Sequence, residues 1–162
     1  MNVTEKTVDS SGNEDVFMEI AHGDRADIRK KIDRLEGEMF CQKDAQVEIE
    51  PVHYFAKGLY AREITIPAGT ILTGKIHKTE HLNIISKGKI SVVTEFGSQV
   101  IEAPATIVSE PGTKRAGYAL EDTVWTTIHA TEEKDLVRLE QELIADSFKE
   151  LEADQRIGIE EQ

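Results

Sequence analysis

The stretch between residues 46 and 130 constrains the fold most, because it is a series of short β-branched and aromatic runs separated by glycine and proline. The runs read VEIEPVHYF, LYAREITIPAGTILTGKIH, HLNIISKGKISVVTEF, SQVIEAPATIVSEPG and TVWTTIHAT. Turn signals recur about every ten residues, and no segment of helical period lies between the runs. This pattern predicts an antiparallel sandwich or barrel over residues 45–130 rather than a parallel sheet built from βαβ units.

Both ends of the chain have a helical pattern instead. Residues 15–44 carry an apolar stripe at helical spacing, with Asp24 as the predicted N-cap. A second helix is predicted over residues 131–152, with Thr131 as its cap and acidic residues in its first turn. The stripes consist of Ile28, Ile32, Leu35 and Met39 in the first helix and of Leu136, Leu139, Leu143 and Ile144 in the second. The acidic residues 1–14 and residues 153–162 are predicted to be flexible tails.

The chain has 162 residues and a formal net charge of −12, so a single soluble domain is expected. Such a negative surface repels phosphate, which argues against nucleic acid and anionic membranes as partners. No run approaches the roughly 18 apolar residues of a membrane span, and the polar N-terminus lacks the pattern of a secretory signal. Cys41 is the only cysteine, which excludes an internal disulfide framework and fits a cytoplasmic location.

Residues 69–88 resemble the first motif of the cupin superfamily, whose members are small jelly-roll barrels. That motif is Gly, five residues, His, one, His, three or four, Glu, six, Gly. Gly69, Lys75, His77, His81 and Gly88 fall at these positions, with Lys75 in place of the first histidine and His81 in place of the glutamate. The resemblance implies a mainly β fold, a double-stranded β-helix (jelly-roll) barrel flanked by the N-terminal and C-terminal helices.

The second cupin motif is matched less closely. The stretch EPGTKRAGYA resembles the Pro-Gly turn that precedes a third metal-binding histidine in the family, but Arg115 takes the place of that histidine. Ala119 replaces the asparagine that usually follows. Since cupins often dimerise through their sheets, and since pairing covers the edges of a jelly roll, a homodimer or higher homo-oligomer is expected.

The chain is also similar to small cupin-like proteins encoded by tailed phages. The stretches that carry this resemblance are HYFAKGLYAREITIPAGT, GKIHKTEHLNIISKGKISVV and PATIVSEPGTKRAGYALEDTVWTTIH. The resemblance implies a phage-encoded protein, located in the host cytoplasm or in the virion, with other phage structural proteins as candidate partners.

His77 and His81 are the first candidates for metal ligands. Side chains alternate along a strand, so Lys75 and His77 share one face, and His81, Asn83 and Ile85 share another. If both strands line the barrel, the two imidazoles converge at its mouth. Imidazole nitrogens suit Zn, Fe, Ni or Cu, and the expected cofactor is a divalent transition metal such as Zn, Fe, Ni or Mn.

Two ligands are too few for a tight site, and the permanently charged Arg115 cannot be the third. His129 is the best remaining candidate, because it shares a strand face with Trp125 and Thr127. His53 and Glu63 are further candidates. The alternative is that these histidines are structural residues of their strands, in a barrel that has lost its metal.

Lys75 and Arg115 take ligand positions in the motif, so both are expected to point into the barrel. Cations in a cavity must be paired or must bind an anion. They are therefore candidate anchors for a carboxylate or phosphate, and the alternative is that they pair with Glu63, Glu80 or Glu110.

Three functions remain open from the sequence. The first is a cupin-like protein that binds a divalent metal, a small anionic ligand or both, with catalysis left undecided. The second is a non-catalytic virion or tail accessory protein, in which the barrel is a scaffold and the two helices dock partners. The third is a metal-free protein that captures a small anionic molecule, for instance a host signal, through Lys75 and Arg115.

Overall fold

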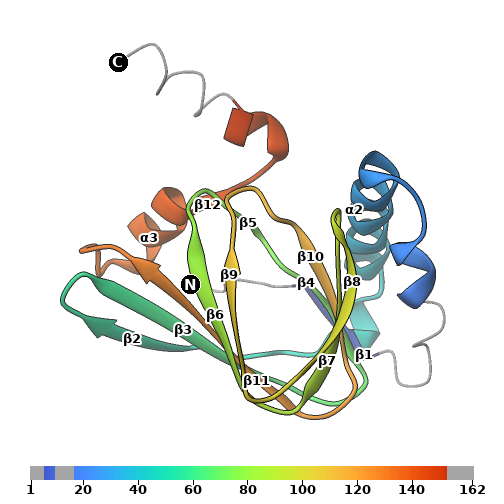
Figure 1. Ribbon diagram of the computed structural model, residues 1–162, viewed down its shortest axis with the longest axis horizontal. Coiled ribbons are helices and arrows are strands. Elements are labelled where there is room, and N and C mark those ends of the chain that lie inside the picture. The colour runs from blue at the N-terminus through green and yellow to red at the C-terminus, as the bar shows by residue number, and fades with distance from the viewer. Residues whose placement is uncertain (1–5, 10–16, 153–162) are drawn as a thin grey trace.

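The computed structural model describes residues 6–9 and 17–152, which form two five-stranded antiparallel sheets with helices at both ends (Figure 1). The first sheet contains β1 (Lys6–Asp9), β4 (Thr70–Thr73), β10 (Arg115–Ala119), β7 (Lys89–Thr94) and β8 (Gly97–Glu102), in this order. The second contains β2 (Val52–Ala56), β3 (Leu59–Ile66), β11 (Thr123–Ala130), β6 (His81–Lys87) and β9 (Ala105–Ser109), in this order. A small third sheet pairs β5 (Ile76–His77) with β12 (Ile144–Ala145).

The connections between the two large sheets define a jelly roll. Eight of the described strands (β3, β4, β6, β7, β8, β9, β10 and β11) can be counted in chain order from one to eight. The second sheet then places them in the order one, eight, three, six, and the first sheet in the order two, seven, four, five. Consecutive strands thus mostly alternate between sheets, as in the double Greek key of a jelly roll, and the predicted fold class is confirmed.

The main core lies between the two sheets, where both contribute inward-facing aliphatic side chains. Its members are Ile64, Ile66, Leu72, Ile85, Ile90, Val92, Ile101 and Ala119. Gly88 makes the tight turn from β6 to β7 with a φ of 88°. A Cβ atom at this position would lie 2.2 Å from the carbonyl oxygen of Asp122, so only glycine fits the turn.

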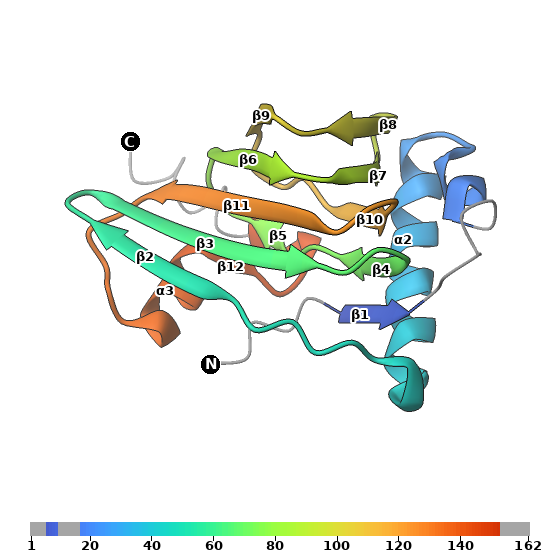
Figure 2. The same ribbon diagram turned by 90° about the horizontal axis from the view of Figure 1, so that it is seen from below.

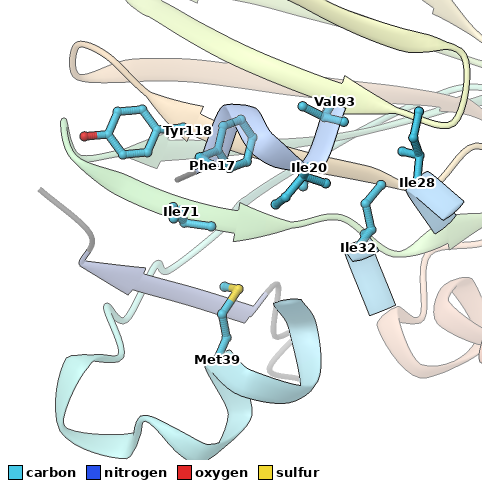
Figure 3. Close-up of a cluster of buried hydrophobic side chains, with 9 residues drawn as sticks. Phe17, Ile20, Ile28, Ile32, Met39, Ile71, Val93 and Tyr118 are labelled. Carbon is cyan, nitrogen blue, oxygen red and sulfur yellow. The ribbon is translucent and has the colours of Figure 1, made fainter. Parts of the chain in front are cut away.

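A second core forms where α2 (Arg25–Cys41) covers the outer face of the first sheet. Figure 3 shows the buried cluster in which Ile28, Ile32 and Met39 of the helix meet strand residues such as Ile71 and Val93. Because this sheet is covered on both faces, every residue of β4 is buried and β7 is buried over four consecutive residues. The predicted helix stripe is confirmed, and so is the N-cap, since Asp24 Oδ1 accepts a hydrogen bond from the Asp27 N–H at 3.0 Å.

The N-terminal region departs from the prediction in two places. Residues 6–9 lie within the predicted flexible tail, but they form β1, which pairs with β4 at the edge of the first sheet. The predicted helix over residues 15–44 is interrupted, because Gly23, with a φ of 127°, separates the short helix η1 (Glu19–Ala21) from α2. After α2, a further 3₁₀ turn, η2 (Lys43–Ala45), leads toward the barrel.

The C-terminal helix is shorter than predicted and begins later. Asp135, not Thr131, caps α3 (Leu136–Leu143), because its Oδ1 accepts from the Arg138 N–H at 3.0 Å. The Thr131 hydroxyl instead accepts from the Glu133 N–H. Leu139 and Leu143 pack on Tyr60 of β3, and the chain then continues as β12 along β5. Figures 1 and 2 show α3 and α2 at different sides of the barrel.

Within residues 6–9 and 17–152, no helix is long and apolar enough to cross a membrane. Cys41, the last residue of α2, is an exposed free thiol.

Candidate metal centre

Three histidines from three strands meet at one end of the barrel. His77 ends β5, His81 begins β6, and His129 lies near the end of β11. Their ring centroids are 4.3 Å apart for His77 and His81, 4.9 Å for His77 and His129, and 4.7 Å for His81 and His129. One ligand nitrogen from each ring lies within 4.8 Å of the other two, so the three residues could hold a metal ion.

Strand geometry explains why these three rings meet. His81 and Asn83 are two residues apart on β6 and therefore share a face of the sheet. Asn83 is the register partner of Thr127 on β11. Thr127 and His129 are in turn two residues apart, so both histidines point from neighbouring strands to the same inner face. His77 joins them because the short turn at residues 78–80 returns the chain from β5 to β6, while β12 holds β5 in place through the pair Ile144–His77.

The hydrogen bonds of the cluster leave nitrogen lone pairs available. His81 Nδ1 lies 2.9 Å from the carbonyl oxygen of Thr79, which only accepts, so Nδ1 carries the hydrogen and Nε2 is the free lone pair. His81 Nε2, His77 Nδ1 and His129 Nδ1 are buried without a hydrogen-bond partner among the described residues. Buried nitrogens without partners are costly, and three of them on adjacent rings suit a shared metal ion.

The surroundings also keep the three rings neutral. Burial lowers the pKa of His77 well below 6.5, and the neighbouring His81 and His129 lower it further. Burial likewise lowers the pKa of His81, with Arg115 contributing, and only the hydrogen bond to Thr79 opposes the shift. The pKa of His129 falls to about 4, mainly through burial and then through His81. Neutral imidazoles bind a metal without first having to lose a proton.

Comparison with known proteins gives structural neighbours only. No protein-family model and no curated protein matches the chain. KdgF from Halomonas sp. aligns with 52% of this chain and 82% of its own at 15% identity, with a TM-score of 0.46. The acetylacetone dioxygenase from Acinetobacter johnsonii aligns with 51% of this chain and 59% of its own at 17% identity, with a TM-score of 0.43. A cupin-2 domain protein from Shewanella frigidimarina aligns with 59% of this chain and 91% of its own at 10% identity, also with a TM-score of 0.43.

These neighbours are cupin-family proteins. The jelly roll itself rests on the strand order described above.

Lys75 and Arg115 occupy different environments in this barrel. Both line the cavity beside His77. Lys75 Nζ is ion-paired with Glu140 of α3. The partners considered from the sequence were Glu63, Glu80 and Glu110. Arg115 donates from Nη2 to the Ser109 hydroxyl, and burial lowers its pKa. Glu140 thus neutralises one of the two predicted anion anchors, whereas Arg115 has no carboxylate partner among the described residues.

The other two candidate ligands lie away from the cluster. His53 is on β2, where its Nδ1 is 2.8 Å from the hydroxyl of Tyr60, and burial lowers its pKa. Glu63 is on β3 and accepts from the Thr126 hydroxyl at 3.2 Å. Neither belongs to the group of side chains that can share an ion.

Two further polar residues near the cluster were missed from the sequence as site residues. Asn83 and Ser109 are both buried, at 2% and 1% exposure, and Asn83 Nδ2 donates to Ser109 Oγ at 2.6 Å. For Asn83 the alternation of β6 gave a signal, since it shares the face of His81. Ser109 gave none, because its proximity depends on β9 pairing with β6.

Proposed function

We propose that this chain is a cupin-like metal-binding protein that holds one divalent transition ion through His77, His81 and His129. The observation that carries the proposal is the convergence of three buried, unpartnered ring nitrogens within the cluster. The lowered pKa values add to it, because all three rings are neutral near pH 7.

The donor set favours particular ions. Three imidazoles suit Zn, Fe, Ni or Cu, whereas Mn prefers oxygen ligands. Three protein ligands leave at least one coordination position for water or for a small molecule. A metal held by these three histidines would supply Lewis-acid chemistry to a small molecule bound beside it.

The test is metal analysis of purified protein after reconstitution with Zn, Fe, Ni, Cu and Mn in separate samples. We expect about one ion per chain in the wild type and none in His77→Gln, His81→Gln or His129→Gln. His53→Gln and His22→Gln are the matched controls, because these histidines lie outside the cluster and should keep the metal. Circular dichroism of each variant separates loss of metal from loss of fold.

Absence of stoichiometric metal in every reconstituted wild-type sample would refute the metal site. The scaffold function or the metal-free binding function would then be the better account of the barrel.

We also propose that two copies of the chain associate through the outer face of the second sheet. A row of register partners crosses all five strands of this face and is entirely apolar apart from the tyrosine hydroxyl. The row is Tyr54, Ala61, Ile128, Leu82 and Val108. Tyr54, Leu82 and Val108 are 50%, 41% and 59% exposed, so no described segment covers them.

A second copy is the occupant that charge and area favour. Two molecules of net charge −12 repel each other, so they can approach most easily through a face with few charged groups. Five strands at about 4.8 Å spacing and five to eight residues of length give a face of roughly 500 Å². Two such faces bury about 1,000 Å², which is near the lower limit for a specific interface.

Sedimentation velocity tests this association. We expect a wild-type dimer that Leu82→Glu and Val108→Glu convert to a monomer. Val100→Glu is the control, because the exposure of Val100, at 53%, lies between those of Leu82 and Val108, but Val100 is on β8 of the other sheet. A monomeric wild type, or a dimer that survives both row variants, contradicts the proposal.

A further inference from the structure

Arg115 is a partly buried cation with no countercharge in the described part of the chain. Its guanidinium donates a hydrogen bond from Nη2 to the hydroxyl oxygen of Ser109, a neutral group. Burying a guanidinium without an anion is unfavourable, because the lost hydration is not replaced by an ion pair. Lys75, Lys114 and Arg29 each have a glutamate partner, so Arg115 differs from the other semi-buried cations.

The hydrogen-bond donors around Arg115 also outnumber the acceptors. Trp125 Nε1 can only donate, and it donates to Asn83 Oδ1 at 2.9 Å, which fixes the orientation of that amide. Asn83 Oδ1 additionally accepts from the Thr127 hydroxyl at 3.1 Å. Asn83 Nδ2 must therefore be the group that donates to Ser109 Oγ.

Ser109 Oγ consequently accepts two hydrogen bonds, one from Asn83 and one from Arg115. Both lone pairs of the hydroxyl are in use, so its own hydrogen is left to donate. The side chain is 1% exposed, and among the described residues this hydroxyl donates to no acceptor. The Ser109 hydroxyl hydrogen and the remaining N–H groups of Arg115 therefore have no acceptor among the described residues. A ligand that satisfies several of these donors needs more than one acceptor oxygen.

The cavity beside Arg115 has an apolar wall. It is lined by Arg115, His77 and Gly117 and by the aliphatic side chains of both sheets. The apolar lining consists of Ile64, Ile66, Leu72, Ile90, Val92 and Trp125. Its volume of about 60 Å³ has room for roughly four to six water-sized groups.

We propose that this cavity binds a small aliphatic carboxylic acid as its carboxylate. The carboxylate accepts hydrogen bonds from the unused N–H groups of Arg115, whose guanidinium is held in place by Ser109, and the short aliphatic chain packs against the apolar wall. A carboxylate has two oxygens with about four acceptor sites, which matches the unused donors. The inference deepens the proposed function, because His77 lines the same cavity, and it names the class of ligand that the site would take.

Lys75 does not share this role. Its ammonium is neutralised by Glu140, so a carboxylate in the cavity would gain little from it. Of the two cations that line the cavity, only Arg115 is expected to anchor the anion. Carboxylate binding should therefore depend on Arg115 and not on Lys75.

The experiment is a fluorescence titration with butyrate, run on metal-free and on metal-loaded protein. Trp125 is the only tryptophan in the chain and lines the cavity, so its emission reports directly on occupancy. We expect saturable binding of butyrate and no binding of butyramide, which has the same shape without the charge. Affinity should fall at least tenfold in Arg115→Met and severalfold in Ser109→Ala, and it should be unchanged in Arg138→Met, whose side chain is 74% exposed.

The outcomes separate this inference from the metal proposal. Butyrate binding to metal-free protein together with failure of metal binding supports the carboxylate site and refutes only the metal site. Metal binding without any butyrate binding overturns the carboxylate site alone. Equal affinity for butyrate and butyramide, or full affinity in Arg115→Met, also overturns it.

Thermal unfolding gives a second readout that does not need the ligand. Without bound carboxylate, Arg115→Met removes an uncompensated charge, so the variant should unfold at the same or a higher temperature than the wild type. With butyrate present, only the wild type should be stabilised further. A variant that loses stability in ligand-free buffer indicates a purely structural arginine and contradicts the inference.

Discussion

The histidine cluster makes the metal-free protein sensitive to mild acid, and His129 allows the size of the effect to be calculated. Burial holds the pKa of His129 at about 4, against 6.5 in the unfolded chain. Between these two values the unfolded state binds a proton that the folded state does not. The contribution of neutral His129 to the free energy of unfolding is therefore fully present above pH 6.5, and it is lost as the pH falls toward 4.

The magnitude follows from the two pKa values of His129. At pH 5 its imidazole is almost fully protonated in the unfolded chain and about one-tenth protonated in the folded chain. The free energy of unfolding should thus fall by about 2 kcal/mol between pH 7.5 and pH 5 from this residue alone. His77 and His81 shift in the same direction and add to the loss.

Urea denaturation of metal-free protein at pH 7.5, 6.5, 5.5 and 5.0 measures the effect. His129→Gln should flatten the pH dependence by about 2 kcal/mol across this range. His22→Gln should leave it unchanged, because His22 is exposed and lies outside the cluster. If the wild type and His129→Gln lose stability in parallel as the pH falls, the ring of His129 is not buried in its neutral form and the reasoning is refuted.

Three further changes test the packing that supports the site. Ile85→Ala deletes a side chain with 0% exposure from the core between the sheets and should cost about 2–5 kcal/mol in urea denaturation, unlike Ile84→Ala on the outer face of the same strand. Gly88→Ala should lower the melting temperature measured by circular dichroism, because its φ of 88° is left-handed and the new Cβ would clash with the Asp122 carbonyl. Glu36→Gln removes the carboxylate that lies 3.0 Å from the ammonium of the almost fully buried Lys114, and it should lower the free energy of unfolding by about 2 kcal/mol. The double variant with Lys114→Met should recover most of that loss. No recovery would show that the two charges are not coupled.

The position of the histidines was predictable because it follows from local geometry. His77 and His81 are four residues apart on either side of a short turn, so the reversal of the chain between their strands brings the rings together. His129 could be added because the alternation of a strand fixes which face a residue occupies. In β11 this rule correctly placed Trp125, Thr127 and His129 on one face of the strand, which is the inner face of the sheet.

The salt bridge of Lys75 could not be predicted in the same way. Glu140 is 65 residues away on α3, and the sequence gives no measure of where a short helix docks. Strand β1 was missed for a related reason, since its four residues pair with β4 only because that edge of the first sheet is open. Both contacts depend on the arrangement of complete elements rather than on the pattern within one.

By itself, the sequence of this protein determined the class of its fold and the faces of its strands and helices, because side-chain periodicity and glycine turns act over a few residues. Only the tertiary structure decided which charges are neutralised and which polar atoms are left without partners. Glu140 neutralises Lys75, whereas Arg115 meets only the hydroxyl of Ser109. The physical reason is that hydrogen bonds and ion pairs require contact within a few ångströms, and such contact between distant segments exists only after the sheets have paired and α3 has packed against the barrel.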